Sequence, residues 1–159
     1  MADRPSAHVE GLKLLAGREL SVEGVRARLL DRGFSREDVE DAVARLLESG
    51  ALDDGRVARA FARTAVTVKG RGRLRVMREL HQMGIDRDVA AEALGEVFAD
   101  VDEWALIAQA LQKKLRGRTK LADAGEYARL YQFLMRQGFS PGGVAAALRR
   151  FRSGSPLEE

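Results

Sequence analysis

A run of positive charge in the middle of the chain is the sequence feature best suited to chemistry. Between Gly55 and Arg78 there are eight basic residues and no acid. Clustered cations bind phosphates or carboxylates, and a guanidinium can do so through two parallel hydrogen bonds. The run therefore predicts a binding surface for a polyanion or an acidic protein, against the alternative of a solvated face that pairs with acidic neighbours. Its candidate residues are Arg56, Arg59, Arg63, Lys69, Arg71, Arg73, Arg75 and Arg78.

A second basic run follows near residue 113, and acidic segments lie between and around the two. The segment 36–54 holds seven acids against two bases, and the segment 84–103 holds seven acids against one base. Charge therefore alternates in blocks along a chain whose formal net charge is only +3, so its distribution matters more than its total. The second run adds the candidate partner-binding or DNA-binding residues Lys113, Lys114 and Arg116.

Arginines of the first run have the spacing of one helix face. On a helix over 71–83, arginines four and three residues apart share a stripe, while Leu74, Met77 and Leu80 occupy a core face. We expect this stripe, with the two cations of the preceding loop, to be the main contact to a partner. The expected contact comprises Lys69, Arg71, Arg73, Arg75 and Arg78.

No set of residues predicts catalysis, a cofactor or a metal site. The chain has no cysteine, which excludes disulfides and thiolate chemistry. Its two histidines, His8 and His81, have no second ligand at metal spacing. Ser35 and Ser140 are explained as helix N-caps. The glycine-rich segment 69–73 lacks the spacing of a phosphate-binding P-loop, and we expect a protein that is not an enzyme.

The elements that position these cations are expected to be helices. Ala, Leu, Arg and Glu dominate the composition, aromatic residues make up only 6%, and such a composition favours an all-α fold. Glycines follow the amphipathic stretches, as left-handed C-terminal caps do: Gly17, Gly33, Gly50, Gly70, Gly84, Gly117 and Gly138. The predicted helices are 7–16, 21–32, 36–49, 54–67, 71–83, 87–99, 101–116, 121–137 and 141–152. We expect one of the adjacent acids Asp53 and Asp54 to cap the helix that begins near residue 54, and Asp54→Ala to remove that cap.

Superposing Gly33, Gly84 and Gly138 discloses a repeat. Four residues before each glycine stands a leucine, one residue after it stands Phe or Ile, and two residues after it stands a capping Ser or Asp. The repeat predicts three tandem three-helix modules in an elongated, curved helical array. The expected modules are 1–50, 51–100 and 101–152, followed by a flexible tail over 153–159. The three equivalent core leucines are Leu29, Leu80 and Leu134.

The segment 51–94, "ALDDGRVARAFARTAVTVKGRGRLRVMRELHQMGIDRDVAAEAL", resembles the signature region of the RecX family, the regulatory proteins of the RecA recombinase. The shared pattern is an apolar residue with two acids, a basic loop containing glycine, and an arginine-rich helix ending at Gly84. The resemblance covers about nine-tenths of the chain. Two residues depart from it: Arg73 stands where the family often has proline, and Val57 stands where phenylalanine is common.

The resemblance implies a non-enzymatic modulator, mainly an inhibitor, in recombination, repair and the SOS response. Family members bind the RecA filament on single-stranded DNA and hinder filament growth, ATP hydrolysis and strand exchange. The expected partners are therefore the RecA filament and single- or double-stranded DNA. We expect the protein to be a monomer. We also expect it in the cytoplasm, since no apolar run is long enough for a membrane span.

Two alternatives stay open from the residues alone. The first is a general nucleic-acid-binding helical protein that acts through phosphate contacts, and the second is a scaffold without a binding role. Sequence-specific reading of the DNA major groove is not expected. The helices that follow the glycine turns begin "REDVED", "RDVAAE" and "PGGVAA", and the positive charge lies instead on the helices before the turns.

Overall fold

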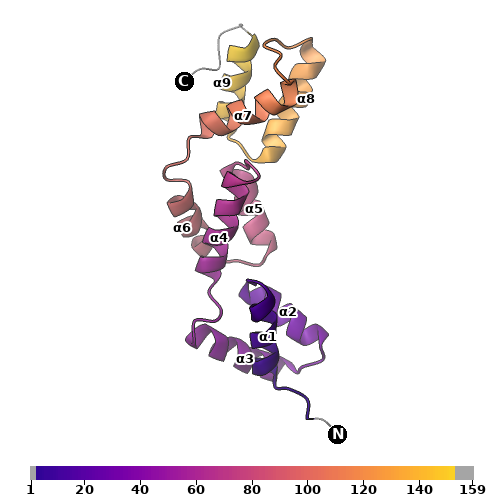
Figure 1. Cartoon of the computed structure of the whole chain (residues 1–159), viewed down its shortest axis with the longest axis vertical. Helices are drawn as coiled ribbons and strands as arrows, with labels where there is room; N and C mark the ends of the chain where they lie inside the picture. The colour runs from indigo at the N-terminus through magenta and orange to yellow at the C-terminus, as the bar shows by residue number, and fades with distance from the viewer. Residues whose placement is uncertain (1–2, 153–159) are drawn as a thin grey trace. The chain divides into compact units, whose positions relative to one another are not determined.

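The computed structural model describes residues 3–152, and within them it contains nine α-helices and no strand (Figure 1). The helices are α1 (Ala7–Gly17), α2 (Val22–Asp31), α3 (Arg36–Glu48), α4 (Asp54–Thr67), α5 (Arg73–Gln82), α6 (Arg87–Val97), α7 (Glu103–Leu115), α8 (Ala124–Gln137) and α9 (Pro141–Arg152). The all-α prediction is confirmed, and the three-helix grouping follows the order α1–α3, α4–α6 and α7–α9. The tail predicted over 153–159 lies outside the described residues.

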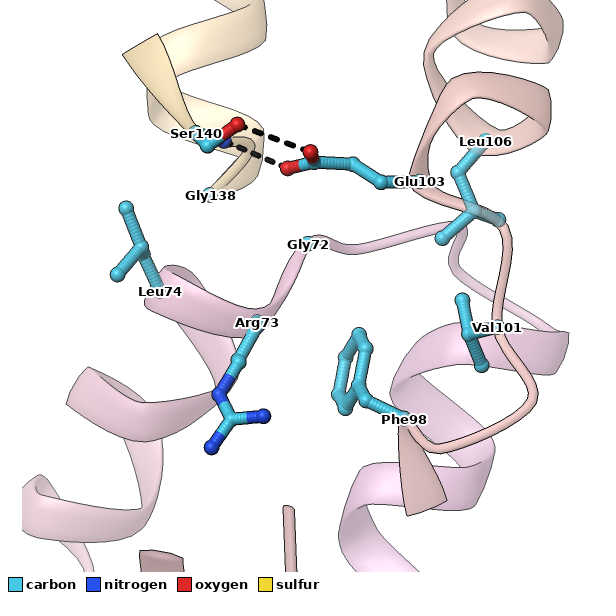
Figure 2. A pocket seen from close by; sticks show the side chains of 9 residues that line it. All are labelled: Gly72, Arg73, Leu74, Phe98, Val101, Glu103, Leu106, Gly138 and Ser140. Atoms are coloured by element: carbon cyan, nitrogen blue, oxygen red, sulfur yellow. Dashed lines mark hydrogen bonds between the residues drawn. The ribbon is translucent and has the colours of Figure 1, made fainter. Parts of the chain in front are cut away.

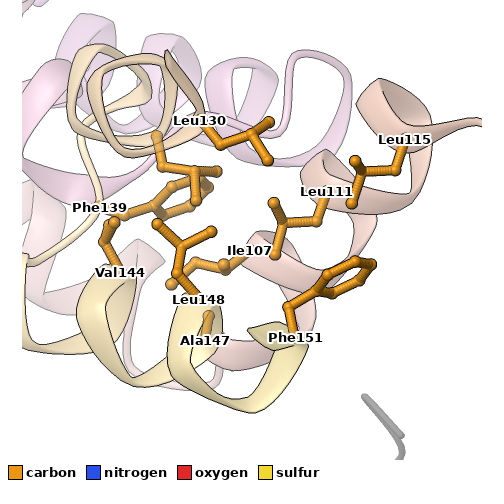
Figure 3. Packing of buried hydrophobic residues seen from close by; sticks show 10 residues of the cluster. Ile107, Leu111, Leu115, Leu130, Phe139, Val144, Ala147, Leu148 and Phe151 are labelled. Atoms are coloured by element: carbon orange, nitrogen blue, oxygen red, sulfur yellow. The ribbon is translucent and has the colours of Figure 1, made fainter. Parts of the chain in front are cut away.

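The described residues divide into two compact units, and the middle three helices contribute to both. One unit contains the residues up to Phe61 together with Glu79–Ala93, and the other contains Ala62–Arg78 together with the residues from Leu94 onward. The first unit is built around the buried side chains of α1–α3, among them Val25, Leu29 and Leu46. The second is built around those of α7–α9 (Figure 3).

The same turn ends α2, α5 and α8, and it explains the repeated glycines. Gly33, Gly84 and Gly138 have φ of 83°, 78° and 97°, a left-handed conformation that glycine adopts without a Cβ penalty. In each turn the glycine N–H donates to the carbonyl three residues back, and the next N–H donates to the leucine carbonyl five residues back. These two bonds satisfy carbonyls that the helix end leaves open. Gly17 differs from the prediction, because it is the last residue of α1 and has no positive φ.

The buried positions follow the repeat. Leu29, Leu80 and Leu134 all have 0% exposure, which confirms the predicted core leucines. The capping residues are also confirmed, since Ser35, Asp86 and Ser140 accept hydrogen bonds from N–H groups in the first turn of the following helix.

Replacing Leu134 with alanine should lower the free energy of unfolding by about 2–5 kcal/mol, because the surrounding side chains cannot close the cavity. Leu29→Ala and Leu80→Ala should fall in the same range, as expected for equivalent positions. Chemical denaturation of the three variants measures this. A cost below about 1 kcal/mol at any of them would contradict the equivalence.

Asp53 and Asp54 differ from the sequence prediction in their roles. The Asp53 carboxylate accepts a hydrogen bond from the Arg56 N–H at 3.0 Å, so Asp53 caps α4. Asp54 instead accepts from the Val22 N–H at the start of α2, at 2.9 Å. One of the two acids caps α4, as predicted, but the cap is Asp53, so Asp54→Ala does not remove it. Asp54 already lies inside the helix and bonds to the start of a neighbouring helix.

The two aspartates should therefore respond differently to mutation. Asp53→Ala should lower the free energy of unfolding by about 1 kcal/mol through the lost cap. Asp54→Ala should cost less: it removes the acceptor of the Val22 N–H, but it also relieves a partly buried charge, whose desolvation raises the pKa of Asp54. Parallel urea titrations of both variants compare them, and the reverse order would contradict the assignment.

The loop before α8 is closed by one carboxylate. Glu126 forms an ion pair with Arg118 and accepts a hydrogen bond from the Ala122 N–H at 2.5 Å. The Arg118 guanidinium, followed by the Ala122 N–H, lowers the pKa of Glu126. Glu126 therefore holds the segment between α7 and α8.

A lowered carboxyl pKa makes stability depend on pH in a definite direction. The unfolded chain binds the Glu126 proton more readily, so this contribution is present above the unfolded pKa of about 4.3 and is lost as the pH falls through the folded pKa. Glu126→Gln should remove this part of the acid sensitivity. Melting temperatures of the wild type and of Glu126→Gln, measured from pH 7 to pH 3, test this prediction. The same dependence on pH in both proteins would contradict it.

Candidate partner-binding surface

The basic loop between α4 and α5 is shaped by two glycines with different functions. Gly70 has φ of 60° and turns the chain at the end of α4. Gly72 is buried, and its N–H donates to the Gln137 carbonyl at 2.8 Å. A Cβ at Gly72 would lie 2.5 Å from the Gly138 backbone. The glycines are therefore required for a turn and for a close backbone approach, which explains the "KGRGR" segment without a phosphate-binding role.

Gly72 belongs to a joint between the start of α5 and the α8–α9 turn (Figure 2). The Leu74 N–H donates to the Gly138 carbonyl at 3.0 Å. On the other side of the turn, the Glu103 carboxylate accepts from the Ser140 N–H at 2.7 Å and from its hydroxyl at 2.9 Å. Four hydrogen bonds thus fix the start of α5, the α8–α9 turn and the start of α7 within one unit.

The other unit contains the same kind of joint at the same repeat position. Ser21 stands twelve residues before Gly33, as Gly72 stands twelve residues before Gly84. The Ser21 hydroxyl donates to the Met83 carbonyl at 2.8 Å. In both joints the acceptor is the carbonyl that precedes the positive-φ glycine of the next module.

The joint at Gly72 brings the two basic runs together. A hollow of about 570 Å³ is lined by Lys69 and Gly70 of the loop and by Lys113, Lys114 and Arg116 at the end of α7. Its other lining residues are Leu106, Gln109, Ala110, Phe133 and Gln137. No acid lines this basic hollow, so the repulsion among its four cations is not offset from within.

One wall of the basic hollow is aromatic. The Lys114 ammonium lies 4.5 Å from the centroid of the Phe133 ring, a distance at which the ring attracts a cation. Lys69, Lys113, Lys114 and Arg116 are exposed, and Phe133 is half-buried. The hollow can therefore attract anions from solvent, and two amide side chains beside it can donate or accept hydrogen bonds.

The predicted arginine stripe is changed by the structure. Helix α5 begins at Arg73, so Arg71 lies before the helix and does not continue its stripe. Arg71 and Arg75 are half-buried, whereas Arg73 and Arg78 are exposed. Leu74, predicted on the core face, is 48% exposed.

The basic residues of α4 are separate from the basic hollow. The Arg56 guanidinium donates to the carbonyls of Gly50 and Ala51 at 3.0 and 3.1 Å and pairs with Glu19 at 3.1 Å. Arg56 therefore closes the connection between α3 and α4. Arg59 is half-buried and Arg63 is exposed, and neither lines the hollow.

Sequence reasoning missed the uncharged lining of the basic hollow. Gln109, Gln137 and Phe133 look like ordinary helix residues in the sequence, and only their helical spacing from Lys113 and the turn at Gly138 places them near the cations.

Among residues 3–152, no group of three or more His, Asp or Glu side chains is arranged for a metal ion. None of the helices in that range has the length and apolar character that crossing a membrane requires.

Three family models match the chain in order: the first RecX three-helix domain over residues 7–46, the second over 53–94 and the third over 100–148. The chain is 32% identical to the "Regulatory protein RecX" of Pelodictyon phaeoclathratiforme over 145 residues, covering 91% of this chain and 88% of that protein. It is 38% identical to that of Halorhodospira halophila over 136 residues, covering 86% and 82%.

A crystal structure of RecX from Lactobacillus salivarius has the same fold, with a TM-score of 0.78 at 16% identity over 91% of this chain and 94% of that one. A second crystal structure, of a regulatory protein RecX, gives a TM-score of 0.75 at 21% identity over 90% of this chain and 70% of that one. The resemblance first seen around the basic loop thus extends over all three modules, and the chain belongs to the RecX family.

Proposed function

We propose that this protein is a non-enzymatic regulator of the RecA recombinase. It binds the RecA filament on single-stranded DNA and limits filament growth, ATP hydrolysis and strand exchange. The relatives' name, regulatory protein, supports a regulatory role. The observation that carries the proposal is the basic hollow, where Lys69 meets Lys113, Lys114 and Arg116 without an acid in the lining.

The basic hollow fits a partner with a regular anionic surface. Its cations are exposed on a unit whose backbone is fixed by the joint at Gly72, so little ordering accompanies binding. Exposed charges of this kind mainly accelerate association. Arg73 and Arg78, both exposed on α5 of the same unit, extend the proposed contact, and Arg71 and Arg75 contribute from half-buried positions.

Titration into a RecA–single-stranded-DNA ATPase assay tests the proposal. We expect ATP hydrolysis to fall with dose at concentrations below that of the recombinase, because each bound regulator blocks growth past its site. Strand exchange should fall in the same range. Undiminished hydrolysis at equimolar protein would contradict the proposal.

A second function, general binding of nucleic acid through phosphate contacts, is supported by the aromatic wall and the amides of the hollow. Phosphate contacts make affinity fall steeply with salt. The two functions differ in one measurement, the affinity for naked single-stranded DNA at physiological salt. Tight binding to naked DNA without an effect on the ATPase would favour the second function.

A further inference from the structure

A second hollow is lined by Gly72 and Arg73 at the end of the basic loop, and its lining is mainly apolar. It has a volume of about 330 Å³ and includes the side chains of Leu74, Phe98, Val101 and Leu106, with Arg73 beside them (Figure 2). Volumes of this size lie at the lower end of the range for ligand pockets. Leu74 is 48% exposed here although its helical spacing is that of a core residue. The apolar hollow therefore contains a large apolar side chain that is not packed into the core.

Apart from the exposed guanidinium of Arg73, the polar groups that line the apolar hollow already have hydrogen-bond partners. The Gly72 and Leu74 N–H groups donate to the Gln137 and Gly138 carbonyls. The two oxygens of Glu103 are occupied by the N–H and hydroxyl of Ser140. A nucleic-acid base placed here would find Arg73 but few other unpaired donors or acceptors for its polar edges, and burying polar groups without partners is unfavourable. An apolar amino-acid side chain has no such cost.

Charge around the apolar hollow restricts what else the occupant carries. Arg73 lines this hollow and is exposed. Leu106 lines both this hollow and the basic hollow, so the two hollows adjoin at this residue. A segment that enters here therefore meets positive charge beside its apolar contact, and acidic residues complement it.

We propose that the apolar hollow receives one large apolar side chain from a protein segment whose neighbouring residues are acidic. The inference rests on the proposed function, because the segment then belongs to the recombinase filament. The joint at Gly72 holds the hollow open in advance, as it fixes the first turn of α5 against the α8–α9 turn. The apolar side chain provides the anchor, and Lys69, Lys113 and Arg73 orient the acidic residues around it.

Site-specific photocrosslinking at position 74 tests the occupant. Benzoylphenylalanine is placed at Leu74, and the protein is irradiated with RecA filaments assembled on fluorescently labelled single-stranded DNA. The same group at Leu47 of α3, which is 46% exposed, is the matched control. We expect a covalent adduct with the recombinase from position 74 and at least tenfold less from position 47. An adduct with DNA, or equal adducts from both positions, would overturn the inference.

Charged substitutions at the same two positions provide a quantitative test. Leu74→Asp should weaken affinity for the filament at least tenfold, because a carboxylate enters the apolar lining and repels acidic residues of the partner. Leu47→Asp should change it less than twofold. Circular dichroism and melting temperature show whether both variants are folded. An unchanged affinity for folded Leu74→Asp would overturn the inference while the proposed function stands, whereas a wild-type protein that fails to bind the filament would overturn both.

Discussion

Replacing Lys69 and Lys113 together with glutamate should slow association with the RecA–single-stranded-DNA filament by at least tenfold at low ionic strength. The two side chains line one hollow without an acid, and reversing both turns an attractive field into a repulsive one. Electrostatic steering changes association rates by factors of about 10–1000. The difference from wild type should shrink as salt rises, because the screening length falls to about 8 Å at physiological ionic strength.

Association rates measured at several salt concentrations check this expectation. The matched control reverses Lys13 of α1 and Arg45 of α3, which are exposed on the other unit, and it changes the net charge equally. The control should keep at least half of the wild-type rate. Equal slowing of both variants would mean that net charge, rather than the basic hollow, governs association.

Replacing Gly72 with alanine should lower the free energy of unfolding by about 3 kcal/mol, at the upper end of the range for overpacked sites. The new Cβ would stand 2.5 Å from the carbonyl of Gly138 and 2.7 Å from the Phe139 nitrogen. Both are backbone atoms of a turn that hydrogen bonds hold in place, so no side-chain movement relieves the contact.

Gly142→Ala is the matched control, since a Cβ there meets nothing within 4 Å. It lies in the first turn of α9, where alanine favours the helix, and the control should be as stable as wild type or slightly more so. Chemical denaturation compares the two variants. A Gly72→Ala protein of wild-type stability would show that the two backbones do not approach as closely as described.

The helices and their ends follow from the sequence because their causes are local. A positive-φ glycine and a capping Ser or Asp two residues later act within one turn of chain, so Gly33, Gly84 and Gly138 mark their helix ends without knowledge of tertiary contacts. The core leucines follow for the same reason, since their distance from each glycine fixes the helix face. Gly17 is the exception, because the helix ends in extended backbone after it.

The candidate binding surface could not be predicted from the sequence in the same way. It is formed by residues far apart in the chain, and helical periodicity does not indicate which of them lie close together. Lys69 and Lys113 line the same hollow because the loop before α5 is hydrogen-bonded to the turn after α8. The same joint fixes the first turn of α5. As a result Leu74 lines the apolar hollow, although its helical spacing predicted a position in the core. Arg56 belongs to the basic run, and its guanidinium bonds to two carbonyls and Glu19. Periodicity did not predict this structural role, and its binding role stays a prediction.

The joint between modules has a consequence for how freely the sequence can diverge. Its acceptor is a main-chain carbonyl in both copies, and its donor is a hydroxyl at Ser21 but a main-chain N–H at Gly72. A main-chain carbonyl is present whatever side chain the residue carries. The donor of the joint can therefore change by mutation while the hydrogen bond between modules is kept. A crystal structure at 16% identity retains the fold, as expected where main-chain groups make part of the connection between modules.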